Sequence, residues 1–315
     1  MKISKNWLNE YLSSNKTNEQ LVDLFTQLGL ECTFQHTKVN LENIVVGKVL
    51  TCIKHPNADR LKVCTVDVGN EVLEIICGAP NIEKNLIVAV AKVGSKFGDF
   101  KIKKTKIRNI FSNGMICSGK ELGLSEDHDG IMILDNDMIL GTALSDALKL
   151  KDDILFDFDI TPNRGDCFSH LGIARELAII ENKKIQLEKI IIKTSDYSIH
   201  DLVKVDIKDD NICDRYACRI VKKIKVEESP QWLKNKLLSI DQKPVNNIVD
   251  IANYIMFDLG QPIHVFDYDK IDGKKININL ANKTDKINCL DNNLRNLDKN
   301  DIVISDSNKP IAIAG

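Results

Sequence analysis

The segment HPNADRLKV, His55–Val63, begins as a loop rich in turn-forming residues and runs directly into a strand-like stretch. Three further motifs follow it in order: CGAPN at 77–81, the basic run KIKKTKIR at 101–108, and SNGM at 112–115. Each motif alone is a weak signal, because short loops and lysine-rich segments are common. Their order and spacing along one continuous region are far more specific and indicate a single domain.

Strand-like runs surround these motifs and are separated by turn residues. They lie at 44–50, 61–68, 73–77, 86–93 and 130–134. Five short strands in roughly ninety residues favour a small Greek-key barrel such as the OB-fold. A sandwich is the structural alternative.

The basic run points to contacts with phosphate. In an extended strand, Lys101 and Lys103 would share one face, whereas Lys104, Lys106 and Arg108 would share the other. A strand combined with a bulge and a loop is therefore needed to aim all five cations together. Phosphate contacts would supply affinity without selectivity. The alternative is a solvated lysine-rich edge that prevents aggregation.

The loop before the second strand allows two interpretations. His55 could stack on a base or touch a phosphate, or it could cap a turn, which is the commoner role of a loop histidine. Asn57 and Asp59 bond their own backbone readily and are expected to shape the loop.

Aromatic residues are scarce in the expected barrel, where only Phe97, Phe100 and Phe111 occur. This scarcity favours binding of folded RNA by shape and backbone over the reading of unstacked bases. The net charge of −2 excludes a uniformly basic coat, so a nucleic-acid site must be a local patch.

Composition indicates a protein of two or three domains in a reducing compartment. The 315 residues contain no apolar run long enough to span a membrane, and Met1–Trp7 lacks the core of a signal peptide. The nine cysteines are scattered without a CxxC pair, so we expect buried thiols in the cytoplasm and no zinc site.

The flanking regions carry helical patterns. Asn18 is the expected N-cap of a helix whose apolar face is Leu21, Leu24, Phe25 and Leu28, and Gly29 is its stop. Later, a turn at 160–166 leads into a helix at 171–179, and 183–200 is expected to be a linker with edge strands. The remaining expected elements are strands at 203–207 and 216–226, helices at 232–240 and 247–257, and a final hairpin of 302–304 and 311–315 that looks cut short.

A second motif is Asn253-Tyr254 followed by GQPIHVFD at 260–267. A lone histidine of this kind is more often structural than catalytic. No serine or cysteine has an activating context, and neither GxGxxG nor GxxxxGK[ST] occurs, so nucleophilic catalysis and a nucleotide loop are unsupported.

The first four motifs look like the tRNA-binding OB domain of some aminoacyl-tRNA synthetases and of free-standing tRNA chaperones. Together with WL at 7–8, EYL at 10–12, TPNR at 161–164, GIARE at 172–176 and GQPIH at 260–264, the chain resembles bacterial phenylalanyl-tRNA synthetase β subunits throughout its length. This resemblance implies an α+β multidomain protein. The expected domains are an N-terminal α+β domain of 1–38 plus 150–195, an inserted OB domain of 40–148, and an incomplete B3/B4-type editing domain of 200–315.

The resemblance also implies a function. The family's α subunit attaches phenylalanine to tRNA(Phe) with ATP and magnesium in a cytoplasmic α2β2 heterotetramer. The β subunit binds tRNA and removes tyrosine wrongly attached to tRNA(Phe), an editing step needed because an apolar pocket rejects an added hydroxyl only modestly. No cofactor or metal is expected on this chain itself.

Site residues follow from the motifs and the resemblance. His264 maps to the editing pocket, with Asn253 and Pro262 nearby and Gly315 at its glycine-rich edge. The expected tRNA contacts are His55, Asn57, Lys62, Lys101, Lys103, Lys104, Lys106, Arg108, Ser112, Asn113 and Met115.

Several positions depart from the family's pattern. Asn109 stands where glycine is usual, Asn113 where glutamate is common, and Val265 where alanine is usual, while DQKP at 241–244 replaces a GIRP-like turn. The family's β subunit is longer, so we expect a fragment that alone neither aminoacylates nor edits. Two alternatives are a stand-alone tRNA-binding or chaperone protein and an editing hydrolase that acts in trans.

Overall fold

The computed structural model describes residues 1–98, 100–125, 129–209 and 211–314. Its contacts divide the chain into two compact units. The first is Met1–Leu187 with Glu228–Pro262, and the second is Glu188–Glu227 with Ile263–Gly315. No helix of the described residues is long and apolar enough to cross a membrane.

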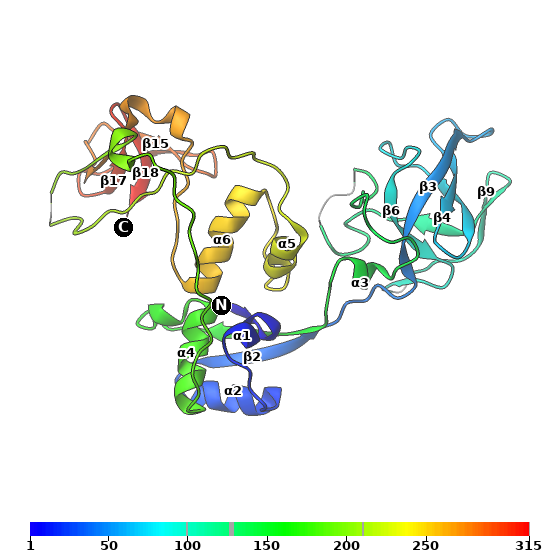
Figure 1. The fold of residues 1–315 in the computed structure, drawn as a ribbon, viewed down its shortest axis with the longest axis horizontal. Coiled ribbons are helices and arrows are strands. Elements are labelled where there is room, and N and C mark those ends of the chain that lie inside the picture. Colours follow the sequence, from blue (N-terminus) through cyan, green and yellow to red (C-terminus); the bar gives the residue numbers. More distant parts are fainter. Residues whose placement is uncertain (99, 126–128, 210, 315) are drawn as a thin grey trace. The chain divides into compact units, whose positions relative to one another are not determined.

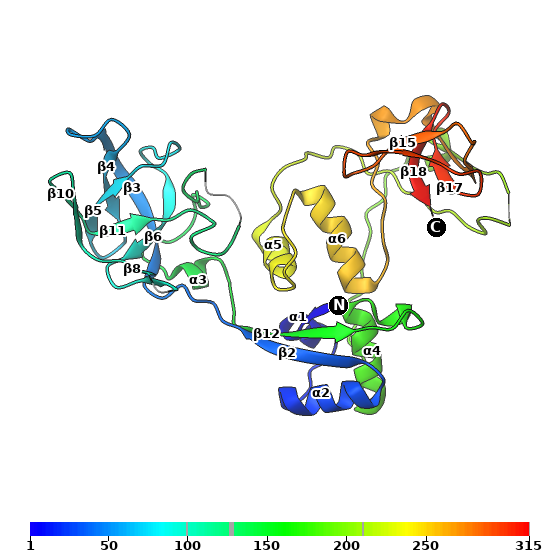
Figure 2. The ribbon, with the colours of Figure 1, turned by 180° about the vertical axis from the view of Figure 1, so that it is seen from behind.

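A three-stranded antiparallel sheet opens the first unit, in the order β1 (Lys2–Ser4), β12 (Asp153–Asp159) and β2 (Glu31–Thr37). Helices α1 (Lys5–Tyr11) and α4 (His170–Ile180) contact each other beside this sheet (Figures 1 and 2). The shared core includes the buried side chains of Ile3, Leu8, Leu21, Phe25, Phe156 and Ile173. Segments from both ends of residues 1–187 thus form one core.

Helix α2 (Asn18–Gln27) begins one residue earlier than expected. Its N-cap is Thr17 rather than Asn18, because Thr17 Oγ1 accepts from the Gln20 backbone N–H at 3.3 Å. The Gln20 side chain accepts in return from the Thr17 N–H at 3.0 Å, which completes a capping box. Gly29 has φ of +75°, as expected for the stop.

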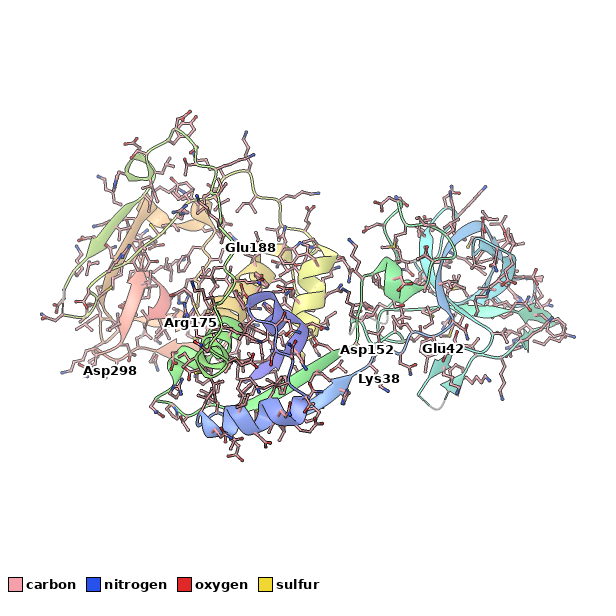
Figure 3. The ribbon with its side chains drawn as sticks, turned by 60° about the horizontal axis from the view of Figure 1, so that its bottom comes forward. Lys38, Glu42, Asp152, Arg175, Glu188 and Asp298 are labelled. Carbon is pink, nitrogen blue, oxygen red and sulfur yellow. The ribbon has the colours of Figure 1, made fainter. Side chains whose placement is uncertain are left out.

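Two crossings connect this sheet to the barrel, one after β2 and one before β12. Figure 3 shows Lys38 and Asp152, which mark these crossings, close to each other. The Val39 backbone N–H donates to Asp152 Oδ1 at 2.9 Å, and Asn6 Nδ2 donates to the Asp152 carbonyl at 2.8 Å. Asp152 therefore links the segment that leads into the barrel to the segment that leads out of it.

The barrel is a five-stranded sheet in the order β11-β6-β3-β4-β5. Its strands are β3 (Ile44–Lys54), β4 (Lys62–Asp67), β5 (Val72–Cys77), β6 (Ile87–Lys92) and β11 (Gly114–Ile116). Two short hairpins, β7 (Lys96–Phe97) with β8 (Phe100–Lys101) and β9 (Thr105–Ile107) with β10 (Ile110–Ser112), lie between β6 and β11 along the chain.

The sheet is nearly closed by contacts between β5 and the segment before β11. The Asn113 N–H donates to the Glu74 carbonyl at 2.8 Å, and the Ile76 N–H donates to Ser112 Oγ at 3.1 Å. A Cβ at Gly47 would lie 2.7 Å from a Val90 methyl, so the interior leaves room only for glycine there. This architecture fits the expected OB-fold.

The interior and one outer face of the barrel form separate apolar clusters. Interior members include Val49, Val66, Ile75, Val88 and Val90. The outer cluster, which includes Ile44, Ala89 and Leu144, is covered in part by the short helix α3 (Leu144–Ala147).

One expected strand is wrong. The fifth barrel strand is β11 at 114–116, not the run 130–134. Strand β11 pairs with β6 at Val90–Lys92, so the later run forms no strand and pairs with β6 at an isolated bridge, Val88–Ile133, next to the hydrogen bond from the Leu134 N–H to the Ile87 carbonyl at 2.8 Å. The apolar run at 130–134 therefore did not predict a strand correctly, because β11 occupies the edge of β6 with which that run would have paired.

Residues 228–262 carry two helices, α5 (Gln231–Leu238) and α6 (Asn247–Leu259), both of them expected. They cluster with the first unit. The Trp7 ring is stacked on His170 at 3.9 Å and on Tyr254 of α6 at 5.1 Å. The expected editing domain began at residue 200, whereas the compact units divide the chain elsewhere, and the three-domain division stays a prediction.

The second unit is built on a four-stranded sheet in the order β13-β14-β17-β18, with β13 parallel to β14. The strands are β13 (Lys204–Ile207), β14 (Lys275–Leu280), β17 (Ile302–Ser305) and β18 (Pro310–Ala314), beside the hairpin β15 (Lys286–Asn288) and β16 (Leu294–Asn296). Described 3₁₀ turns lie at Gly165–Cys167, Ile199–Asp201, Tyr268–Lys270 and Asp272–Lys274.

Two sequence expectations are wrong near this sheet. Residues 216–226 are not a strand. None of them pairs with the four-stranded sheet, and Lys223 has φ of +59°, which extended backbone does not adopt. The linker at 183–200 also contains no strand among its residues, all of which the structure describes.

Candidate nucleic-acid interface

The basic run folds as strand, loop and hairpin rather than as one extended strand. Lys101 ends β8, Lys103 and Lys104 lie in the connection, and Lys106 lies in β9. Between them, Ile102 is buried, and its backbone N–H donates to the Ser95 carbonyl at 2.8 Å. One buried anchor therefore fixes the run while the flanking lysines remain exposed.

The β9–β10 hairpin turns at Arg108 and Asn109, with φ values of +48° and +75°. Two positive values suit the two-residue turn that matches the twist of paired strands. Asparagine tolerates this region better than most residues, so it can stand where the family usually has glycine. In the two ribbon views the hairpin lies on the side of the barrel away from α3 (Figures 1 and 2).

The hairpin brings an aromatic ring to the cations. Lys106 is the cross-strand partner of Phe111, whose side chain is 47% exposed. The ammonium of Lys106 lies 5.6 Å from the ring centroid, and that of Lys104 lies 4.9 Å from it. The sequence alone identified Phe111 as one of three aromatic residues in the expected barrel and gave it no role in binding. The turn at Arg108 and Asn109 is the signal that would have paired it with Lys106.

The loop residues have structural roles. His55 is 2% exposed, and its Nδ1 accepts from the Asn57 backbone N–H at 3.0 Å. The His55 backbone N–H donates to the Leu61 carbonyl at 2.9 Å. A base cannot reach this buried ring, so the structure favours the turn-shaping role over stacking. Lys62 is also engaged, because its ammonium donates to the Ile82 carbonyl at 2.7 Å.

The SNGM residues close the barrel. Ser112 is buried, and its hydroxyl donates to the Gly114 carbonyl at 3.0 Å while accepting from Ile76. Asn113 bonds β5 through its backbone. Met115 is half-buried against the outer apolar cluster. Ser112 and Asn113 hold the hairpin against β5. The expected tRNA contacts that the structure leaves exposed are Asn57, Lys101, Lys103, Lys104, Lys106 and Arg108, and the exposed Phe111 lies beside two of these lysines.

The expected editing residues are not brought together within either unit. Asn253 lies half-buried on α6, and Pro262 ends the first unit. His264 belongs to the second unit, where its exposed ring is stacked on Phe266 at 6.0 Å. Gly315 lies outside the described residues. A shared pocket for these four residues therefore stays a prediction.

One side-chain group in the described parts has ligand atoms close enough for a metal, namely Asp166, Cys167 and Glu176 within 4.8 Å. Arg164 occupies this group, since its guanidinium bonds Asp166 and lies 3.0 Å from Glu176. The same guanidinium lowers the pKa of Asp166, and burial raises the pKa of the Cys167 thiol to about 12. The Arg164 guanidinium and the protonated Cys167 thiol make this group a poor site for magnesium, because magnesium prefers oxygen ligands.

Comparison with known proteins places these features in a family context. The family model described as "Putative tRNA binding domain" matches residues 44–143, and the B3/4 domain model matches residues 212–315. Each covers about a third of the chain, and between them they include the barrel and most strands of the second unit's sheet.

Curated relatives match the whole chain. A phenylalanine–tRNA ligase beta subunit from Fusobacterium nucleatum is 44% identical over 318 aligned residues, which cover 100% of this chain and 40% of that protein. One from Protochlamydia amoebophila is 41% identical over 320, with the same shares. The chain thus spans about two-fifths of the length of these relatives. A MetRS-related protein of known structure from Pyrococcus horikoshii aligns with 32% of the chain at 19% identity and a TM-score of 0.25, and the alignment covers 87% of that protein.

Proposed function

We propose that this chain, a relative of phenylalanine–tRNA ligase beta subunits along its whole length, works as part of such a subunit. It binds tRNA and contributes to removal of tyrosine from mischarged Tyr-tRNA(Phe). An α subunit attaches phenylalanine to tRNA(Phe) with ATP and magnesium, in a cytoplasmic α2β2 assembly. In this proposal, the chain consists of a barrel inserted into an N-terminal α+β domain and followed by the start of an editing domain.

The observation that carries tRNA binding is the cation cluster on the β8–β10 segment. Five exposed cations, Lys101 to Arg108, project from a region matched by the tRNA-binding model in a protein of net charge −2. Phosphate neutralisation needs such local concentration of charge. The buried anchors Ile102 and Ser112 keep the cluster on a fixed framework, so little conformational freedom is lost on binding.

The proposed editing role rests on resemblance and on the B3/4 match. His264 is exposed in its unit, which leaves it free to approach an ester. Hydrolysis would require water held close to that ester by fixed groups. Asn253, Pro262 and Gly315 are the proposed companions of His264 in that pocket.

Binding of tRNA by the full 315-residue chain is the direct test. Affinity for purified tRNA is measured at several salt concentrations, and log affinity should fall linearly with log salt. Absence of binding at low salt would refute the tRNA-binding role. Editing is tested separately in the assembled enzyme, where His264→Ala should raise tyrosine mischarging and leave phenylalanine charging nearly unchanged.

A further inference from the structure

Phe111 is an exposed aromatic beside two members of the cation cluster, Lys104 and Lys106. Large apolar side chains on a small domain usually face its core, and the β10 neighbour Ser112 does lie buried. Phe111 instead presents 47% of its surface, with two ammonium groups within 6 Å of its ring. A ring face set among cations is the arrangement that single-stranded nucleic acid requires, with one group for the base and others for its phosphates.

We propose that Phe111 stacks on an unpaired base of bound RNA while Lys104 and Lys106 hold the phosphates on either side of that nucleotide. This inference rests on the proposed tRNA binding and names the part of the ligand that is bound. The ligand is an unpaired stretch of a folded RNA, such as a loop or an end, and not a duplex. The one ring that the hairpin presents to solvent thus departs from the binding by shape and backbone alone that the scarcity of aromatics favours.

The lysines already beside the ring do not prevent stacking. A cation–π contact at an exposed site stabilises by about two- to fivefold. Stacking of one base contributes roughly five- to more than a hundredfold. Both lysines are exposed and have flexible stems, so their ammonium groups can move from the ring to phosphates when a base arrives. After this exchange the two ammonium groups bind phosphates, and the base stacks on the ring in their place.

The framework behind the ring favours this role. Ser112 bonds Ile76 and Gly114 directly beside Phe111, and Lys106 pairs with Phe111 across the hairpin. The ring is thus held on a strand rather than on a loose loop, which reduces the entropy lost on binding. Because every base has a π face, the contact is expected to tolerate any base.

The test compares two RNA probes bound by the full chain. One is an RNA hairpin with an unpaired loop, and the other is a blunt RNA duplex with the same number of phosphates. Phe111→Ala should weaken binding of the looped RNA by about tenfold and leave duplex binding and the salt slope nearly unchanged. Phe111→Tyr should retain binding, and Phe111→Leu should lose most of it, since it keeps apolar bulk but no π face.

Two controls separate stacking from other effects. Phe168→Ala removes a ring with similar exposure, 45%, outside the barrel, and should not change either affinity. Phe111→Trp adds an indole whose fluorescence should be quenched by the looped RNA and not by the duplex, even if the alanine variant is unstable. Equal losses on both probes, or no quenching, would overturn the stacking role while leaving tRNA binding intact. A wild-type chain that binds neither probe nor tRNA would instead overturn the proposed function.

Discussion

The indole Nε1 of Trp7 donates a hydrogen bond of 2.8 Å to the carboxylate of Asp258, which lies 251 residues further along the chain. The same oxygen accepts from the Tyr11 hydroxyl at 2.7 Å. Asp258 is 7% exposed, so both donors depend on it. This contact joins α1 to α6 and, with the stacking of Trp7 on Tyr254, helps to hold α6 in the first unit.

We expect Asp258→Ala to destabilise the first unit by about 2 kcal/mol or more, because it leaves buried donors unsatisfied. Asp258→Asn keeps an acceptor oxygen and should cost clearly less. Thermal and urea unfolding of both variants provide the measurement. If the alanine and asparagine variants unfold alike, the hydrogen bonds to Trp7 and Tyr11 contribute little.

The cation cluster should determine the salt dependence of tRNA binding. Replacing Lys103, Lys104 and Lys106 together with Ala should lower the slope of log affinity against log salt by about 2 to 3, because each neutralised phosphate contributes roughly 0.7–0.9 to that slope. The matched control replaces three exposed lysines elsewhere, Lys189, Lys193 and Lys299. An unchanged slope in the first variant, or an equal change in the control, would move the site away from the hairpin.

The turn of the hairpin should accept glycine and reject a β-branched residue. Asn109 has φ of +75°, so Asn109→Gly relieves any strain, whereas Asn109→Val should destabilise by about 1–2 kcal/mol. Melting temperatures test this order. We also expect the valine variant to bind tRNA less tightly, because a distorted hairpin misplaces Lys106. Equal stability of the two variants would contradict the turn geometry.

His170 should make stability fall in mild acid. Burial lowers its pKa to about 3, and the neutral ring accepts from the Ser4 N–H at 3.1 Å while bonding the Phe257 carbonyl at 2.9 Å. The unfolded chain binds the proton at about pH 6.5, so stability is full above that pH and declines as pH falls toward 3. The slope for one proton is at most about 1.4 kcal/mol per pH unit.

Urea unfolding between pH 7 and pH 4 measures that decline. His170→Asn should be less stable at pH 7 and should show a flatter pH dependence. His200→Gln, which removes an exposed histidine, should follow the wild-type curve. A wild-type slope that survives in the His170 variant would assign the proton to another group.

The 315-residue chain alone should not release tyrosine from Tyr-tRNA(Phe). Pro262 lies two residues from His264 but has no side-chain donor or acceptor, and Asn253 belongs to the first unit, so within the second unit no polar member of the proposed pocket is described beside His264. One polar group is insufficient to position water. Release of tyrosine well above the spontaneous rate would show that the chain completes the pocket without a partner. Purified chain and mischarged tRNA are sufficient for this measurement.

Local patterns in the sequence predicted much of the fold because their causes are local. Apolar runs predicted β3 to β6, and the spacing of Leu21 and Phe25 predicted α2. A prediction was wrong where two neighbouring residues could both have had the same role. Thr17 and Asn18 can both cap a helix, and only the reach of Gln20 back to Thr17 decided between them. The strand β11 was missed because three residues that begin with glycine carry too little pattern.

By itself, the sequence determined most of the local elements, namely the strands β3 to β6 and the helices α2, α4, α5 and α6, since hydrogen bonds and side-chain spacing within a few residues set those choices. It also placed the five cations in one run. Only the tertiary structure decided that Phe111 lies beside Lys104 and Lys106, that His55 is buried, and that Asp258 serves Trp7. These contacts depend on how strands register and how distant helices pack, and no periodicity along the chain carries that information.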